Sequence, residues 1–114
     1  MHYWDDGKIE LVEEFKVLFL NRANYVLQII TLSQGGISGT VADTRIILAT
    51  ALKLASSSIV LSHNHPSGNL RPSQADEMLT QKITNAAAWH DIKVLDHIVV
   101  TTERYYSFAD NRYL

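Results

Sequence analysis

The sequence predicts a single α/β domain, and three observations support this fold class. The chain has 114 residues, which is enough to bury one hydrophobic core without disulfides or metal ions. Its composition, 46% hydrophobic and 19% charged, is typical of a globular protein and not of a disordered or coiled-coil chain. Short apolar runs typical of strands alternate with longer segments of helical periodicity. We therefore expect one domain over residues 1–114, with its core in residues 11–110.

Two apolar segments near the N-terminus predict a pair of strands, at residues 11–20 and 25–32. Residues 17–20 and 25–27 are aliphatic or aromatic almost without interruption, which is typical of strands covered on both faces. The polar segment 21–24 between them has the length of a hairpin loop. The two strands are therefore expected to pair in antiparallel fashion.

The rest of the chain predicts two helices and three strands. Residues 44–56 are rich in alanine and repeat at helical spacing, with Asp43 as the expected N-cap. Residues 58–61 and 94–101 predict buried strands, and residues 105–108 a short edge strand. Residues 73–90 predict the second helix, with an inner face formed by Met78, Leu79, Ile83, Ala86 and Ala87. The order β-β-α-β-α-β-β predicts a mixed sheet flanked by helices.

Other conspicuous side chains are expected to be structural. Phe19 and Trp89 are predicted to lie in the core, and His90 on the surface. Asp96 and His97 fall inside an apolar strand, where buried polar groups normally find hydrogen-bond partners. We interpret them as a hydrogen-bonded core pair and not as metal ligands.

Two histidines at the end of the third predicted strand could bind a metal ion. His63 and His65 are two residues apart, so in an extended chain they project to the same face. Imidazole is a good ligand for zinc and other borderline metals. Asp76 follows eleven residues after His65, in the first turn of the second predicted helix. Two histidines and one carboxylate leave a fourth tetrahedral position open, as in a catalytic zinc site.

The spacing alone leaves a second interpretation open. In a chain of 114 residues with five histidines, one His-x-His pair is expected by chance roughly 20% of the time. Asp76 also has an ordinary structural explanation, because Ser73-x-x-Asp76 matches a capping box with Ser73 as the N-cap. A metal site and a capped helix beside a turn are both consistent with this pattern, and Ser73 can cap the helix while it faces the site.

The wider sequence around these residues resembles a known protein family. The runs HNHPSG at residues 63–68 and PSQAD at residues 72–76 are similar to the JAMM motif, His-x-His followed by ten residues and Asp. Residues 39–40, 95–99 and 107–110 also resemble the bacterial RadC-like branch of the JAB/MPN metallopeptidases, so the likeness spans residues 11–110. The chain departs from that branch in lacking a match to its N-terminal helical region and in lacking a glycine after Asp110.

The resemblance implies a cytidine-deaminase-like α/β fold that holds one zinc ion. It implies zinc ligands at His63, His65 and Asp76, and a serine at Ser73 that helps to stabilise an oxyanion. It also implies a glutamate on the first strand that activates the catalytic water, and the Glu-x-Phe entry into that strand matches at Glu13. Glu14, the adjacent candidate, is expected to point to the opposite face of the strand.

The resemblance therefore implies a zinc-dependent hydrolase that cleaves a peptide or isopeptide amide in an unidentified protein or peptide substrate. Zinc deaminases share the fold, but they need a Pro-Cys-x-x-Cys run and this chain has no cysteine. The alternative is a RadC-type accessory module linked to DNA repair or mobile elements, in which the metal is structural or vestigial.

The net charge and the hydropathy of the chain indicate which partners and which cellular compartment to expect. A formal net charge of −2 does not favour direct binding to a DNA duplex. The apolar runs are far shorter than the roughly 20 residues of a membrane span, and the polar start of the chain does not resemble a signal peptide. We expect a cytoplasmic protein without a membrane segment.

Overall fold

A computed structural model of the chain describes residues 13–34 and 43–111. These described residues form five strands and two helices in the expected order β-β-α-β-α-β-β. Residues 11–12 of the first predicted strand, and residues 39–40 of the resemblance, lie outside the described residues. In chain order the elements are β1 (Glu14–Leu20), β2 (Val26–Gln34), α2 (Thr44–Lys53), β3 (Ser58–Asn64), α3 (Gln74–Ala88), β4 (Lys93–Val100) and β5 (Tyr105–Ser107).

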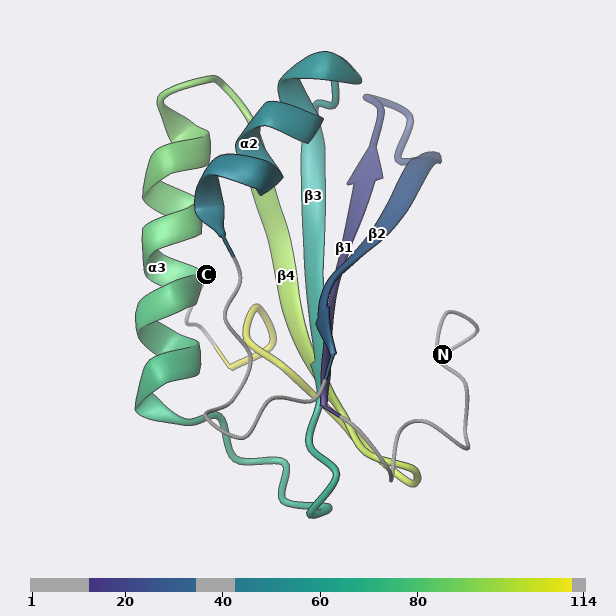
Figure 1. The fold of residues 1–114 in the computed structure, drawn as a ribbon, viewed down its shortest axis with the longest axis vertical. Coiled ribbons are helices and arrows are strands. Elements are labelled where there is room, and N and C mark those ends of the chain that lie inside the picture. The colour runs from purple at the N-terminus through teal and green to yellow at the C-terminus, as the bar shows by residue number, and fades with distance from the viewer. Residues whose placement is uncertain (1–12, 35–42, 112–114) are drawn as a thin grey trace.

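The five strands form one mixed sheet in the order β2-β1-β3-β4-β5, which Figure 1 shows nearly edge-on. β1 pairs in antiparallel fashion with both β2 and β3, and β4 pairs in the same way with β5. β3 and β4 run parallel and are joined through α3, as a parallel connection requires. The expected hairpin between the first two strands is confirmed, and β3 lies in the centre of the sheet.

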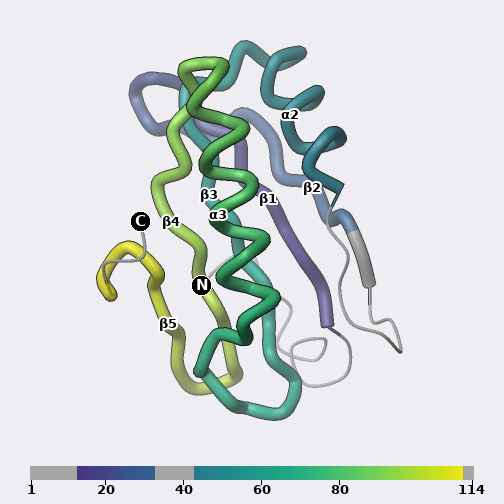
Figure 2. Tube along the Cα trace, turned by 90° about the vertical axis from the view of Figure 1, so that its left-hand side faces the viewer, coloured from purple at the N-terminus to yellow at the C-terminus, as the bar shows by residue number. Residues whose placement is uncertain are grey.

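Both described helices cover the same face of this sheet, as Figures 1 and 2 show from two directions. Ile47 and Ala51 of α2 and Ile83 and Ala87 of α3 are buried in one core cluster. The sheet contributes alternate residues of its central strands to the same cluster, namely Phe15, Val17, Phe19, Ile59 and Leu61. The end of this helix-covered face, beyond the apolar cluster, is where the histidines lie.

Each helix is capped by the residue that the sequence predicts, although α3 spans Gln74–Ala88 and not residues 73–90. The Asp43 side chain accepts a hydrogen bond from the Arg45 backbone N–H at 2.9 Å and caps α2. Ser73 caps α3 in the same way. α2 ends at Lys53 and not at residue 56, because Ala55 adopts a left-handed φ of 53° that cannot continue a right-handed helix. Neither described helix is both long and apolar enough to cross a membrane.

Three expectations about burial are wrong. Residues 25–27 are expected in a strand covered on both faces, but Tyr25 lies just before β2, and it is exposed together with Val26 and Leu27 of this edge strand. Met78 was placed on the inner face of α3 and is 64% exposed. Trp89 was placed in the core and is 88% exposed, because it follows the last turn of α3 as its C-cap. Phe19 is fully buried and His90 is exposed, as expected.

We predict that Phe19 and Trp89 contribute very differently to stability. Phe19→Ala should lower the free energy of unfolding by about 3–5 kcal/mol, because it leaves a cavity in a closed core. Trp89→Ala should change the free energy of unfolding by no more than about 0.5 kcal/mol, because its ring lies largely in solvent. Urea unfolding monitored by circular dichroism measures both values. A large loss in Trp89→Ala would contradict the exposed position of this side chain.

Candidate metal centre

The end of β3 brings His63 and His65 together as the spacing predicts. His63 is the penultimate residue of β3, and His65 follows directly after the strand. The two imidazole Nε2 atoms lie 2.9 Å apart. Backbone bonds hold this segment, because the His65 N–H donates to the Val100 carbonyl and the Gly68 N–H donates to the His65 carbonyl. Gly68 adopts a φ of +84°, which suits glycine in the turn that follows.

The first turn of α3 places Asp76 against both histidines. One carboxylate oxygen, Oδ1, lies 3.3 Å from His63 Nε2, and the other, Oδ2, lies 3.3 Å from His65 Nε2. The predicted capping box is also present: the Asp76 N–H donates to Ser73 Oγ at 3.0 Å, and the Ser73 N–H donates to Asp76 Oδ2 at 2.8 Å. The capping box is therefore confirmed, and the same carboxylate also faces both histidines.

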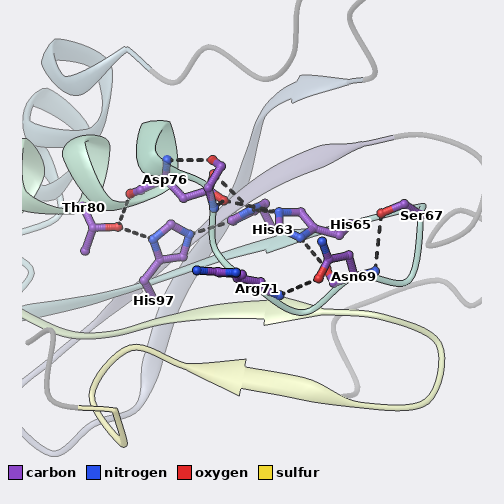
Figure 3. Close-up of polar contacts among 9 residues, drawn as sticks. His63, His65, Ser67, Asn69, Arg71, Asp76, Thr80 and His97 are labelled. Atoms are coloured by element: carbon purple, nitrogen blue, oxygen red, sulfur yellow. Dashed lines mark hydrogen bonds and ion pairs between the residues drawn. The ribbon is translucent and has the colours of Figure 1, made fainter.

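His65 turns its Nε2 atom toward this centre because its other ring nitrogen is engaged. His65 Nδ1 lies 2.6 Å from the Asn69 carbonyl oxygen, an acceptor, so Nδ1 carries the proton and donates it. In the neutral imidazole Nε2 then has a free lone pair. Asn69 also accepts the Arg71 backbone N–H through its side-chain oxygen at 3.0 Å, which stabilises the loop (Figure 3).

The centre includes a third histidine that sequence reasoning did not assign to it. His97 on β4 is fully buried, and its Nε2 atom lies 2.7 Å from His63 Nδ1. Phe15 stacks on the His63 ring with centroids 6.0 Å apart, and Phe108 stacks on the His97 ring at 4.6 Å. The expected Asp96–His97 pair exists only through the backbone, because Asp96 Oδ1 accepts the His97 N–H.

The surroundings of this centre shift the pKa values of Asp76, His65 and His97 in different directions. Burial would raise the pKa of Asp76, but hydrogen bonds with His63 and His65 outweigh it and lower the pKa well below its usual range. The hydrogen bond with Asp76 raises the pKa of His65 above its ordinary value, against the opposing effect of burial. Burial lowers the pKa of His97 to about 3, and the nearby His63 acts in the same direction. Asp76 is therefore an anion and His97 a neutral imidazole at pH 7.

The donor atoms fit a zinc ion. Two nitrogens and one carboxylate oxygen match the ligand types and the three-ligand count of a catalytic zinc site. Ligands bound at about 2.0–2.1 Å in a tetrahedron lie roughly 3.3 Å from one another. The separations here are 2.9 Å between the two imidazole nitrogens and 3.3 Å from each nitrogen to Asp76. Without a cation or proton between them, two Nε2 lone pairs at this distance would repel each other.

Glu13 also lies beside this centre. It directly precedes β1, and a carboxylate oxygen comes within 4.8 Å of ring nitrogens of His63 and His65. By this distance Glu13, His63 and His65 also form a candidate metal site, although Asp76 lies closer to both rings. Glu14 is 2% exposed, and its N–H donates to Asn64 Oδ1 at 2.6 Å.

An open pocket of about 590 Å³ borders the centre. Its walls include Glu13, His65, Arg71, Ser73 and Asp76. The Ser73 hydroxyl accepts the Asp76 N–H, so its own proton remains available to a second acceptor in the pocket. Figure 3 shows how residues from β3, the following loop, α3 and β4 converge here. Of the five residues singled out from the sequence, Glu13, His65, Ser73 and Asp76 line this pocket, and His63 contacts His65 and Asp76.

Comparison with known proteins places this arrangement in a family. The sequence profile described as the RadC-like JAB domain matches residues 2–113. The chain is 49% identical over 98 residues to a UPF0758 protein of Flavobacterium johnsoniae, a match that covers 86% of this chain and 43% of that protein. It is 41% identical over 99 residues to UPF0758 protein YfjY of Escherichia coli strain K12, covering 87% of this chain and 62% of YfjY.

A UPF0758 protein of Haemophilus ducreyi is 37% identical over 113 residues, which are 99% of this chain and 51% of that protein. The chain therefore spans about half the length of the curated relatives that it matches. Its profile match, its identities to these relatives and its α/β fold agree with one another. The chain belongs to the RadC-like JAB domain family.

Proposed function

We propose that this chain is a zinc-dependent hydrolase of the JAMM type that cleaves a peptide or isopeptide amide bond. The observation that carries the proposal is the convergence of His63 Nε2, His65 Nε2 and the Asp76 carboxylate within 3.3 Å of one another. Membership of the JAB family supports the same chemistry. His63, His65 and Asp76 are the proposed ligands, and a zinc ion bound there would act as a Lewis acid toward water and a carbonyl group.

Glu13 is the proposed general base. The three ligand side chains would have their lone pairs engaged, so a carboxylate outside the ligand set is needed to accept a proton from the attacking water. Glu13 borders the pocket and lies within 4.8 Å of both histidines, whereas Glu14 is buried at the next strand position. Alternation along β1 puts Glu13 on the same side as Phe15, whose ring stacks on His63.

Ser73 is the proposed oxyanion donor. As an N-cap its oxygen is an acceptor from Asp76 N–H, and this fixes the position of the hydroxyl while its proton remains free to donate. A donor held in place before the reaction stabilises the negative charge that develops on the attacked carbonyl oxygen. The pocket is open to solvent and large enough for a peptide segment, which supports a protein or peptide substrate.

Elemental analysis should find one zinc ion per chain. Asp76→Asn should weaken zinc binding more than about 100-fold, because even groups behind metal ligands contribute about 10–100-fold. Glu13→Gln should keep stoichiometric zinc. Competition with a chromophoric chelator measures both affinities, with His90→Ala as a control for an exposed histidine. If Glu13→Gln loses zinc while Asp76→Asn retains it, the third ligand is Glu13. Stoichiometric zinc in a His63→Ala, His65→Ala double variant would contradict the proposal that zinc binds at this site.

The general-base role predicts a specific loss of rate. On a panel of peptide and isopeptide substrates, zinc-loaded Glu13→Gln should lose about 10²–10⁴ in turnover, the usual contribution of general acid–base catalysis. It should keep the fold and the zinc, since glutamine preserves volume and most hydrogen bonds. Glu14→Gln is the comparison, with its fold checked by circular dichroism. An active Glu13→Gln beside a folded but inactive Glu14→Gln would assign the base to Glu14.

The two helix caps offer a matched test of Ser73. Ser73→Ala and Asp43→Ala should each lower the free energy of unfolding by about 1 kcal/mol, because each removes one N-cap. Only Ser73→Ala should also lower turnover, by about 10²–10³, as expected for the loss of an oxyanion donor. Equal turnover in both variants would leave Ser73 with a capping role alone.

The panel also separates the two candidate functions. A zinc-loaded wild-type chain that cleaves none of these substrates would favour the accessory module, in which the metal is structural or vestigial.

A further inference from the structure

His97 is a buried polar residue that the proposed chemistry does not use. Its ring is fully buried on β4, and both of its nitrogens are engaged. Nε2 lies 2.7 Å from His63 Nδ1, and Nδ1 contacts Thr80 Oγ1 on α3. Figure 3 shows this row of contacts from Thr80 through His97 to His63.

The direction of these hydrogen bonds follows from counting protons at Thr80. Its hydroxyl has one proton, and Oγ1 donates it to the Asp76 carbonyl oxygen at 2.7 Å, a common bond for threonine inside a helix. With that proton used, Oγ1 can only accept from His97 Nδ1. His97 therefore carries its proton on Nδ1.

The same reasoning gives the position of the proton on His63. A fully buried imidazole with no carboxylate among its hydrogen-bond partners is neutral, so His97 Nε2 has a lone pair and accepts from His63 Nδ1–H. When a metal replaces the Nε2 proton of His63, the proton that remains is on Nδ1, and the Nε2 lone pair is then free beside Asp76 and His65. That is the tautomer a metal ligand requires.

We propose that His97 is a positioning residue for the metal centre, which holds His63 in the Nδ1–H tautomer with Nε2 directed at the metal. Thr80 fixes His97, because Thr80 Oγ1 accepts from His97 Nδ1–H. The same Oγ1 is held in place by its bond to the carbonyl oxygen of Asp76, which is itself a proposed ligand. The contacts form a chain from one ligand to another, from Asp76 through Thr80 and His97 to His63. Phe108 stacked on His97 holds the plane of the ring. The proposal rests on the metal centre of the proposed function but not on hydrolysis.

Two threonines on the same helix provide a matched experiment. Thr80→Val removes the hydroxyl that accepts from His97, whereas Thr84→Val makes the same change one turn later. Thr84 Oγ1 is buried and has no hydrogen-bond partner among the described residues. Zinc affinity, measured by chelator competition, should fall about 10–100-fold in Thr80→Val and stay at the wild-type value in Thr84→Val.

Substitution of His97 completes the test. His97→Leu should weaken zinc binding by the same 10–100-fold, and His97→Gln, whose side-chain oxygen can accept from His63 Nδ1–H, should recover most of it. Circular dichroism of the metal-free variants checks the fold, and Thr80→Val carries the test if His97→Leu does not fold. In the zinc-loaded wild type, nitrogen-15 NMR should show the His97 proton on Nδ1.

Each outcome decides a different point. Wild-type affinity in both Thr80→Val and His97→Leu, or a His97 proton on Nε2, would overturn the positioning role and leave the metal centre standing. A wild-type chain that binds no zinc would overturn the metal centre and the positioning role together.

Discussion

The antiparallel pairing of β1 with β3 is the constraint on which the site depends. Its register sets Phe15 opposite His63, and the Glu14 N–H donates to Asn64 Oδ1 at the end of both strands. Glu13, two residues before Phe15, therefore lies on the face of the sheet that carries His63. A slip of one residue would bring Glu14 to this side and remove Phe15 from the His63 ring. One strand pairing thus places the proposed base and packs a proposed ligand.

A second constraint is the cost of burying imidazoles beside the core. His63 and His97 are 1% and 0% exposed, and an unpaired polar group at such a position costs roughly 1–3 kcal/mol. Their contact with each other and the contact of His97 with Thr80 provide partners on this inner side. Phe15 and Phe108 cover the faces of the two rings and exclude water. The side of His63 that remains for a ligand is the one that faces Asp76, His65 and the pocket.

Much of this architecture could be predicted from the sequence, because the responsible signals are local. The caps at Asp43 and Ser73 and the alternation in β1 require only neighbours in the chain. The exposure of β2 and Trp89 could not be predicted, because the apolar character of a segment does not reveal whether another element covers its side chains. The contacts of His97 could not be predicted either, since its partners Thr80 and His63 lie 17 and 34 residues away in sequence. The parallel pairing of β3 and β4 brings His97 beside His63, and the packing of α3 on the sheet brings Thr80 to His97.

Asp76 shows how a structural residue and a proposed ligand can be the same side chain. The capping box already orients Oδ2 through the Ser73 N–H, and the N-terminus of α3 favours a negative charge at this place. The lowered pKa of Asp76 means that a cation would not have to displace a proton from the carboxylate. Because the cap sets the rotation of the carboxylate, Oδ1 faces His63 and Oδ2 faces His65. The helix therefore pre-organises the site with interactions that it needs for its own stability.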